Sequence, residues 1–216
     1  MSTATTHIKT EKQLVPELRF KEFENNWIKK KLIDWKLVVL DGDRGSNYPS
    51  GGDFQPEGYC LFMNAKNVTK TGFSFEERMF ITKEKDELLR KGKLKREDLV
   101  LTTRGSVGHI AYYEQSIPFE NLRINSGMVV IRNENKLINS KFIYVNFHTP
   151  SLIRQVSTIA FGSAQPQLTV KEINKFKFNQ IIDFIDNFWA ILILSFLLII
   201  SLVWIIWNNF KKEKNM

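Results

Sequence analysis

The feature that most constrains the fold is an uninterrupted apolar run near the C-terminus. Residues 188–207 read FWAILILSFLLIISLVWIIW, twenty residues without a charge in which Ser195 and Ser201 are the polar exceptions. At a rise of 1.5 Å per residue, a helix of this length spans roughly 30 Å, the thickness of a bilayer's hydrocarbon core. A domain of this size cannot cover a helix that is apolar on every side, so the run predicts a transmembrane helix rather than a core helix.

This run divides the chain into five parts. Residues 1–13 form a polar, flexible arm, 14–178 a globular domain, 179–187 a junction, 188–207 the apolar helix and 208–216 a basic tail. The whole chain has 31 Lys and Arg against 23 Asp and Glu, and residues 1–187 keep 28 against 22, a net charge of +6. The basic excess therefore belongs to the globular part, where it suits phosphates or another anionic surface. Many soluble proteins are equally basic, so charge alone does not identify the partner.

The globular part alternates short strand-like runs with short helical ones. We therefore predict an α+β fold, with a mixed or largely antiparallel β core and flanking short helices. A capping box at Thr169–Glu172 opens one more short helix. The predicted strands are 38–40, 59–63, 99–103, 110–113 and 127–132, and the predicted helices are 82–94, 140–147 and 151–159, the last two with a serine as N-cap.

Signatures of catalysis and of cofactor binding are missing from the sequence. It has no GxxxxGK[ST] loop, no GxGxxG motif and no Asp/Asn-Pro-Pro-aromatic tetrad, and Cys60 and the three scattered histidines have no zinc-ligand spacing. Asp41, Asp43 and Asp53 lie in a glycine-rich loop, where acidic residues ordinarily make turns rather than a metal site. We expect a non-catalytic protein without metal or cofactor, in a reducing cytoplasmic setting.

Polar loops adjoin several of the predicted strands and carry the residue types that read DNA. Arginine bonds guanine bidentately, and asparagine or glutamine bonds adenine in the same way. Each loop could equally be a plain turn with solvated side chains, but four of them on one β scaffold favour a binding surface. The candidate DNA-binding residues are Asn64, Lys66, Arg104, Ser106, Arg123, Asn125 and Gln165.

Four blocks of the globular part resemble the specificity subunits of type I restriction–modification enzymes, in the order found in that family. They are PELRFKEFENNWIKKKL (16–32), LTTRGSVGHIAYY (101–113), RINSGMVVIR (123–132) and AFGSAQPQLTVKEINKFKF (160–178). The resemblance covers about residues 14–178. It implies a non-catalytic target-recognition domain that reads one half of a bipartite site in double-stranded DNA. By position, the family's loop residues fall on Arg104, Ser106, Arg123, Asn125 and Gln165.

The resemblance also implies partners. In that family, two recognition domains are held apart by long paired helices that dock the modification (methyltransferase) subunits, and methyl transfer and restriction belong to partner subunits. Here the chain reads NQIIDFIDNFWAILIL where a spacer helix is expected, so the docking helices and the second domain are missing. We therefore interpret the chain as a truncated or frameshifted form of such a subunit.

Two other functional classes compete with this interpretation. The first is a tail-anchored membrane protein with no restriction role, whose basic domain faces the cytoplasm at the inner face of the cell membrane. The second is an enzyme such as a nuclease, for which the sequence offers no catalytic constellation. Within the DNA-binding interpretation, the loops leave open which residues touch bases, although phosphate contact is favoured for Arg104.

Overall fold

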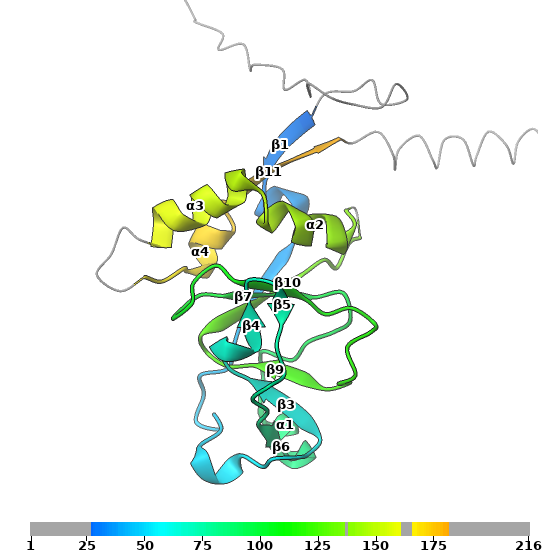
Figure 1. Ribbon diagram of the computed structural model, residues 1–216, viewed down its shortest axis with the longest axis vertical. Helices are drawn as coiled ribbons and strands as arrows, with labels where there is room; N and C mark the ends of the chain where they lie inside the picture. The colour runs from blue at the N-terminus through cyan, green and yellow to red at the C-terminus, as the bar shows by residue number, and fades with distance from the viewer. Residues whose placement is uncertain (1–26, 137, 161–165, 182–216) are drawn as a thin grey trace, which may run out of the picture. The chain divides into compact units, whose positions relative to one another are not determined.

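The computed structural model describes residues 27–136, 138–160 and 166–181, shown in colour in Figure 1. Its largest sheet has four strands in the order β2-β10-β7-β8, and all neighbouring strands are antiparallel. These strands are β2 (Val38–Asp41), β7 (Leu99–Thr102), β8 (Ile110–Tyr112) and β10 (Met128–Arg132). Residues 30–178 form one compact unit that contains this sheet.

A second sheet has three strands in the order β6-β3-β9, and its β3–β9 pair is parallel. Its strands are β3 (Cys60–Met63), β6 (Phe80–Ile81) and β9 (Leu122–Ile124). Two further sheets have two strands each and join β4 (Val68–Thr69) to β5 (Gly72–Phe73) and β1 (Trp27–Lys31) to β11 (Lys177–Ile181). Short 3-10 turns occupy Ile33–Trp35, Gly51–Asp53 and Ala65–Asn67.

The core is built on both faces of β3. Successive strand residues point to opposite faces, so Leu61 and Met63 enter the main apolar cluster with side chains of β7, β9 and β10. Cys60 and Phe62 point the other way and pack with Ile81 and Leu89 in a smaller cluster. Because both faces are covered, all four residues of β3 are buried, as are those of β7 and β9.

The helices are α1 (Lys83–Leu88), α2 (Ser140–Phe147), α3 (Pro150–Ala160) and α4 (Val170–Ile173). The predicted helix 82–94 is too long, because the backbone becomes extended at Leu89. The chain then pairs with β9 through a hydrogen bond from Leu94 N–H to the Leu122 carbonyl at 2.9 Å. Neither predicted serine is an N-cap, because Asn139 caps α2 and Ser151 lies inside α3, which begins at Pro150. The capping box of Thr169 and Glu172 is confirmed.

The α+β class with a mixed, largely antiparallel β core is confirmed. In the described ranges no helix is long and apolar enough to cross a membrane. The predicted span 188–207 lies outside these ranges, as do the arm 1–13 and the tail 208–216, and all three stay predictions.

Candidate nucleic-acid interface

Four loops meet at one edge of the domain, because the strands before them end there. In the register of the large sheet, Asp41 pairs with Val129 and Thr102 pairs with Met128, so β2 and β7 end where β10 begins. The parallel pair β3–β9 also ends there, with Met63 opposite Ile124, since three residues join β9 to β10. We call residues 42–45, 64–67, 103–106 and 125–127 the loop edge.

Backbone hydrogen bonds hold these loops together. The Gly127 carbonyl accepts from the N–H groups of Thr103 at 2.8 Å and Arg104 at 3.2 Å, and Asn125 N–H donates to the Met63 carbonyl at 3.1 Å. Gly42 packs so closely that a Cβ atom there would lie 2.2 Å from the Asn125 carbonyl oxygen. The loops therefore form a shaped surface and not a set of independent turns.

Arg104 is the most available cation of the loop edge. Its side chain is exposed, and within the described part of the chain its guanidinium has no hydrogen-bond or ion-pair partner. Gly105 follows with φ of +70°, a left-handed conformation that glycine adopts without steric cost, and Ser106 is also exposed. The turn thus presents five guanidinium donors and a hydroxyl to an incoming acceptor.

Asn64 and Lys66 lie on the neighbouring loop. The Asn64 carboxamide oxygen accepts from Lys66 N–H at 2.8 Å and caps the 3-10 turn Ala65–Asn67. The Lys66 ammonium lies 2.7 Å from a Glu77 carboxylate oxygen, with exposed fractions of 73% and 57% for the two side chains. An ion pair this exposed adds little stability, so Lys66 can exchange Glu77 for a phosphate.

The prediction that Arg123 lies on a loop is wrong, because the structure places it in the interior. It is the middle residue of β9 and its side chain is 3% exposed. Its guanidinium donates to the Asp86 carboxylate at 2.7 Å, to the Asp86 carbonyl at 2.9 Å, and to the Lys91 carbonyl. Arg123 therefore fixes α1 and the following segment onto β9, and its side chain is not placed to contact DNA.

The buried Asp86 carboxylate is held in its charged form by two cations. Burial by itself would raise the pKa of Asp86, but the hydrogen bonds from Lys93 and Arg123 outweigh burial and lower that pKa. The same surroundings leave the buried Cys60 thiol inert, since burial raises its pKa to about 12.

Asn125 also has an internal partner. It is half-buried, and its carboxamide oxygen accepts from Gly127 N–H at 2.9 Å, which shapes the turn between β9 and β10. Gln165 lies outside the described residues. Sequence reasoning missed Arg44, whose half-exposed guanidinium lies 3.1 Å from the Asp41 carboxylate and 3.3 Å from the Ser126 carbonyl. The available signal was its place directly after β2, in the glycine-rich loop.

The acidic residues of that loop are committed to its internal structure. Asp43 accepts from the N–H groups of Gly45 and Arg90, both at 2.7 Å, and from Lys91 N–H at 3.2 Å. The hydrogen bond from Gly45 is the main reason that the pKa of Asp43 is lowered. Among the residues that the structure describes, no group of three His, Cys, Asp or Glu could hold a metal ion.

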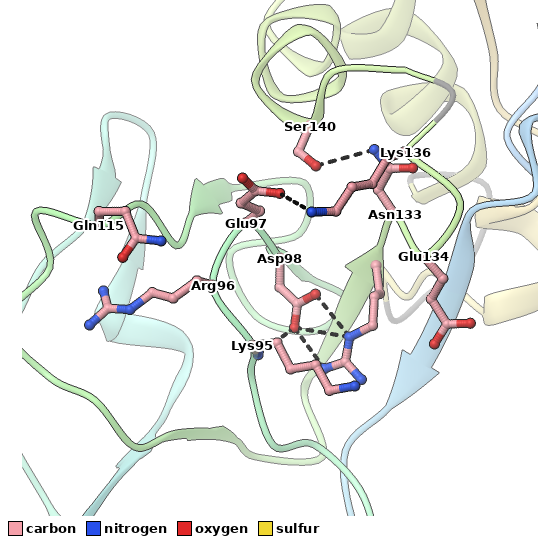
Figure 2. A pocket seen from close by; sticks show the side chains of 10 residues that line it. Lys95, Arg96, Glu97, Asp98, Gln115, Asn133, Glu134, Lys136 and Ser140 are labelled. Atoms are coloured by element: carbon pink, nitrogen blue, oxygen red, sulfur yellow. Dashed lines mark hydrogen bonds and ion pairs between the residues drawn. The ribbon is translucent and has the colours of Figure 1, made fainter.

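A pocket of about 520 Å³ lies at the opposite end of the large sheet and differs in charge from the loop edge (Figure 2). In it the Asp98 carboxylate accepts from Arg132 at 2.7 Å, where β7 begins and β10 ends. The Lys136 ammonium lies 4.0 Å from a Glu97 carboxylate oxygen. Figure 2 shows these two side chains facing each other. Two of the three carboxylates of this pocket pair with cations that also line it, so its charge is mixed.

Solved structures of type I restriction–modification proteins are similar to this chain. The structure titled "Structural basis underlying complex assembly and conformational transition of the type I R-M system" matches 77% of this chain at 13% identity, with a TM-score of 0.50. The S subunit from M. genitalium matches 72% of this chain at 16% identity, with a TM-score of 0.49. The HsdS subunit from Thermoanaerobacter tengcongensis matches 76% of this chain at 14% identity, with a TM-score of 0.45. This chain covers 36%, 34% and 34% of their respective lengths.

No curated protein sequence matches this chain. A family model does match: the type I restriction modification DNA specificity domain, over residues 44–180. The match covers more than half of the chain, and it includes every strand and loop that builds the loop edge from Arg44 onward. The chain therefore belongs to the type I restriction modification DNA specificity domain family.

Proposed function

We propose that this chain is a DNA-specificity module that reads one half of a bipartite target through its loop edge. The observation that carries the proposal is the convergence of four loops from different strands around an exposed, unpartnered Arg104 in the described part of the fold. Loops on a rigid β scaffold can vary in sequence without changing the fold beneath them, which is what a family of specificity modules requires.

We assign direct contact to the exposed polar side chains of the loop edge. These are Arg104, Ser106, Lys66 and Arg44. Asn64, Asn125 and Arg123 act instead as positioning residues, because their polar atoms already serve internal hydrogen bonds. Gln165 remains a proposed contact from its place in the sequence.

The proposed partners follow from the family. We infer that modification and restriction subunits supply the chemistry, while residues 14–178 supply recognition in the cytoplasm, where the DNA is. Insertion of 188–207 into a membrane remains a prediction from the sequence, and the described residues add no observation in favour of the tail-anchored alternative.

Equilibrium binding of the full chain to duplex DNA at several salt concentrations tests the proposal. Affinity should fall steeply with salt, because bound lysines and arginines release counterions from phosphates. Arg104→Gln should weaken binding to the preferred sequence by about 1–3 kcal/mol if Arg104 reads a base, and weaken binding to all sequences alike if it meets a phosphate. Lys136→Gln, at the opposite end of the sheet, is the charge-matched control. An affinity for DNA that changes neither with salt concentration nor with Arg104→Gln would refute the proposal.

A further inference from the structure

A basic segment runs along the outside of β9. Ile124 N–H donates to the Gly92 carbonyl and Leu94 N–H donates to the Leu122 carbonyl, each at 2.9 Å. Lys93 and Arg123 therefore form an antiparallel β-bridge. The segment is therefore extended, so alternate side chains point to opposite sides. Gly92 and Leu94 are buried, and three lysines face outward at positions 91, 93 and 95.

These lysines line a groove of about 620 Å³ beside β2. Its charge is strongly one-sided, with Asp41 as the sole carboxylate among its lining residues, and that carboxylate pairs with Arg44. The groove shares Lys95 and Arg132 with the pocket of Figure 2, which is lined in addition by the carboxylates of Glu97, Asp98 and Glu134. The cations that line the groove are Arg90, Lys91, Lys93, Lys95 and Arg132.

Three of these cations have no acidic partner within the described ranges. Lys93 pairs with Asp86, and Arg132 pairs with Asp98 at 2.7 Å. The side chains of Arg90, Lys91 and Lys95 are exposed and make no ion pair or hydrogen bond with described residues. Three unpaired cations along one extended segment attract a linear polyanion more strongly than scattered surface lysines do.

The groove is continuous with the loop edge. The Asp43 carboxylate accepts from both Arg90 N–H and Lys91 N–H, which fixes the start of the basic segment to the loop after β2. Gly92, with φ of +86°, brings its backbone against the Gly42 Cα atom. From Lys91 to Lys95 the chain covers at most roughly 13 Å, up to about four nucleotide steps at 3.4 Å each.

From this geometry we infer that the groove beside β2 binds the phosphate backbone of DNA that flanks the half-site. The inference rests on the proposed function of the loop edge and extends it. The loop edge reads the sequence, and Arg90, Lys91 and Lys95 hold a neighbouring stretch of the same duplex whatever its sequence. Phosphate contacts of this kind fix the register of a protein on DNA without carrying sequence information.

The test compares Lys91→Gln/Lys95→Gln with Lys83→Gln/Lys141→Gln in the full chain. Both double variants remove two exposed lysine charges, and the control lysines lie on α1 and α2, outside the groove. Each variant is titrated at several salt concentrations with a short duplex limited to the half-site, a long duplex with flanks, and a long duplex of unrelated sequence.

On both long duplexes the groove variant should bind more weakly and lose about 2 from the slope of log affinity against log salt. At roughly 0.1 M salt, two lost phosphate contacts correspond to at most about 60-fold in affinity. On the short duplex the groove variant should match the wild type, and Lys91→Arg/Lys95→Arg should restore the slope on the long ones.

The outcomes separate this inference from the one it rests on. If the wild type binds no duplex DNA, the proposed function and this inference both fail. If the wild type binds DNA and the groove variant equals the control variant on long duplexes, only this inference fails. It also fails if the groove variant binds DNA normally but no longer captures purified modification subunit, since the groove would then be a protein-binding surface.

Discussion

Replacing Arg123 distinguishes its structural role from the DNA-binding role that the sequence suggests. Arg123→Ala removes a guanidinium that donates to the Asp86 carboxylate and to the backbone carbonyls of Asp86 and Lys91. The Asp86 carboxylate, 1% exposed, then keeps Lys93 as its remaining charged partner. Lys93 is 43% exposed and approaches from the solvent side, so it compensates in part.

The expected loss of stability is about 3 kcal/mol. Breaking a buried ion pair by removing one partner costs about 3–5 kcal/mol, and the remaining Lys93 places this case at the lower end. For a domain of this size, 1 kcal/mol shifts Tm by roughly 2–4 °C, so Tm should fall by about 6–12 °C. Asp86→Leu/Arg123→Met removes both charges together and should cost less than Arg123→Ala alone.

Urea unfolding followed by circular dichroism measures the stability of each variant, and DNA binding is measured separately at a temperature where the variants remain folded. Under those conditions the Arg123 variants should keep most of their affinity, whereas Arg104→Gln should keep its stability and lose affinity. An Arg123→Ala chain with wild-type stability and selectively weakened DNA binding would refute the assignment of Arg123 to the interior.

Three further predictions concern the loops, acid stability and the apolar run. Gly42→Ala should cost about 1–3 kcal/mol in urea unfolding, because its Cβ would lie 2.2 Å from the Asn125 carbonyl oxygen; Gly51→Ala, with open space around it, should be nearly neutral. The pKa values of Asp43 and Asp86 are lower in the folded protein than in the unfolded chain, so the two charged carboxylates stabilise the fold. This stabilisation is complete above the unfolded-state pKa of about 3.9, and it is lost as pH falls through the lower folded-state pKa values. Unfolding at pH 6 and pH 3 should therefore differ less in Asp43→Asn and Asp86→Asn than in the wild type. The full chain should pellet with membranes through 188–207, whereas a chain ending at Phe178 should stay in the supernatant; equal partition of the two would contradict that prediction.

The sequence was sufficient to predict the fold class and the strands β2, β3, β7, β8 and β10, because apolar runs bounded by turn residues mark them. It also located the loops that follow β3 and β7. Their meeting at one edge depends on pairings between distant segments, such as the parallel pair β3–β9, which local patterns do not encode.

Two errors have the same physical origin. Arg123 is a charged residue inside a three-residue strand, and in the sequence such a residue suggests a loop. The partner that keeps Arg123 buried is Asp86, which lies 37 positions earlier. The charged run 82–94 with Leu88 and Leu89 suggests one long helix, but Leu89 and Leu94 are buried by an extended segment that pairs with β9. In both cases a long-range contact overrides the local pattern.

Selection from a pool of randomised duplex DNA tests the central claim, sequence-specific recognition by this chain, most directly. Repeated binding to the full chain, followed by sequencing, should enrich one short motif that matches half of a bipartite site. The same selection with Arg104→Gln should alter or lose the preference at one or more positions of that motif. If the wild-type chain enriches no motif while it still binds the pool in a salt-dependent way, it binds DNA without reading it, and the proposed specificity role is wrong.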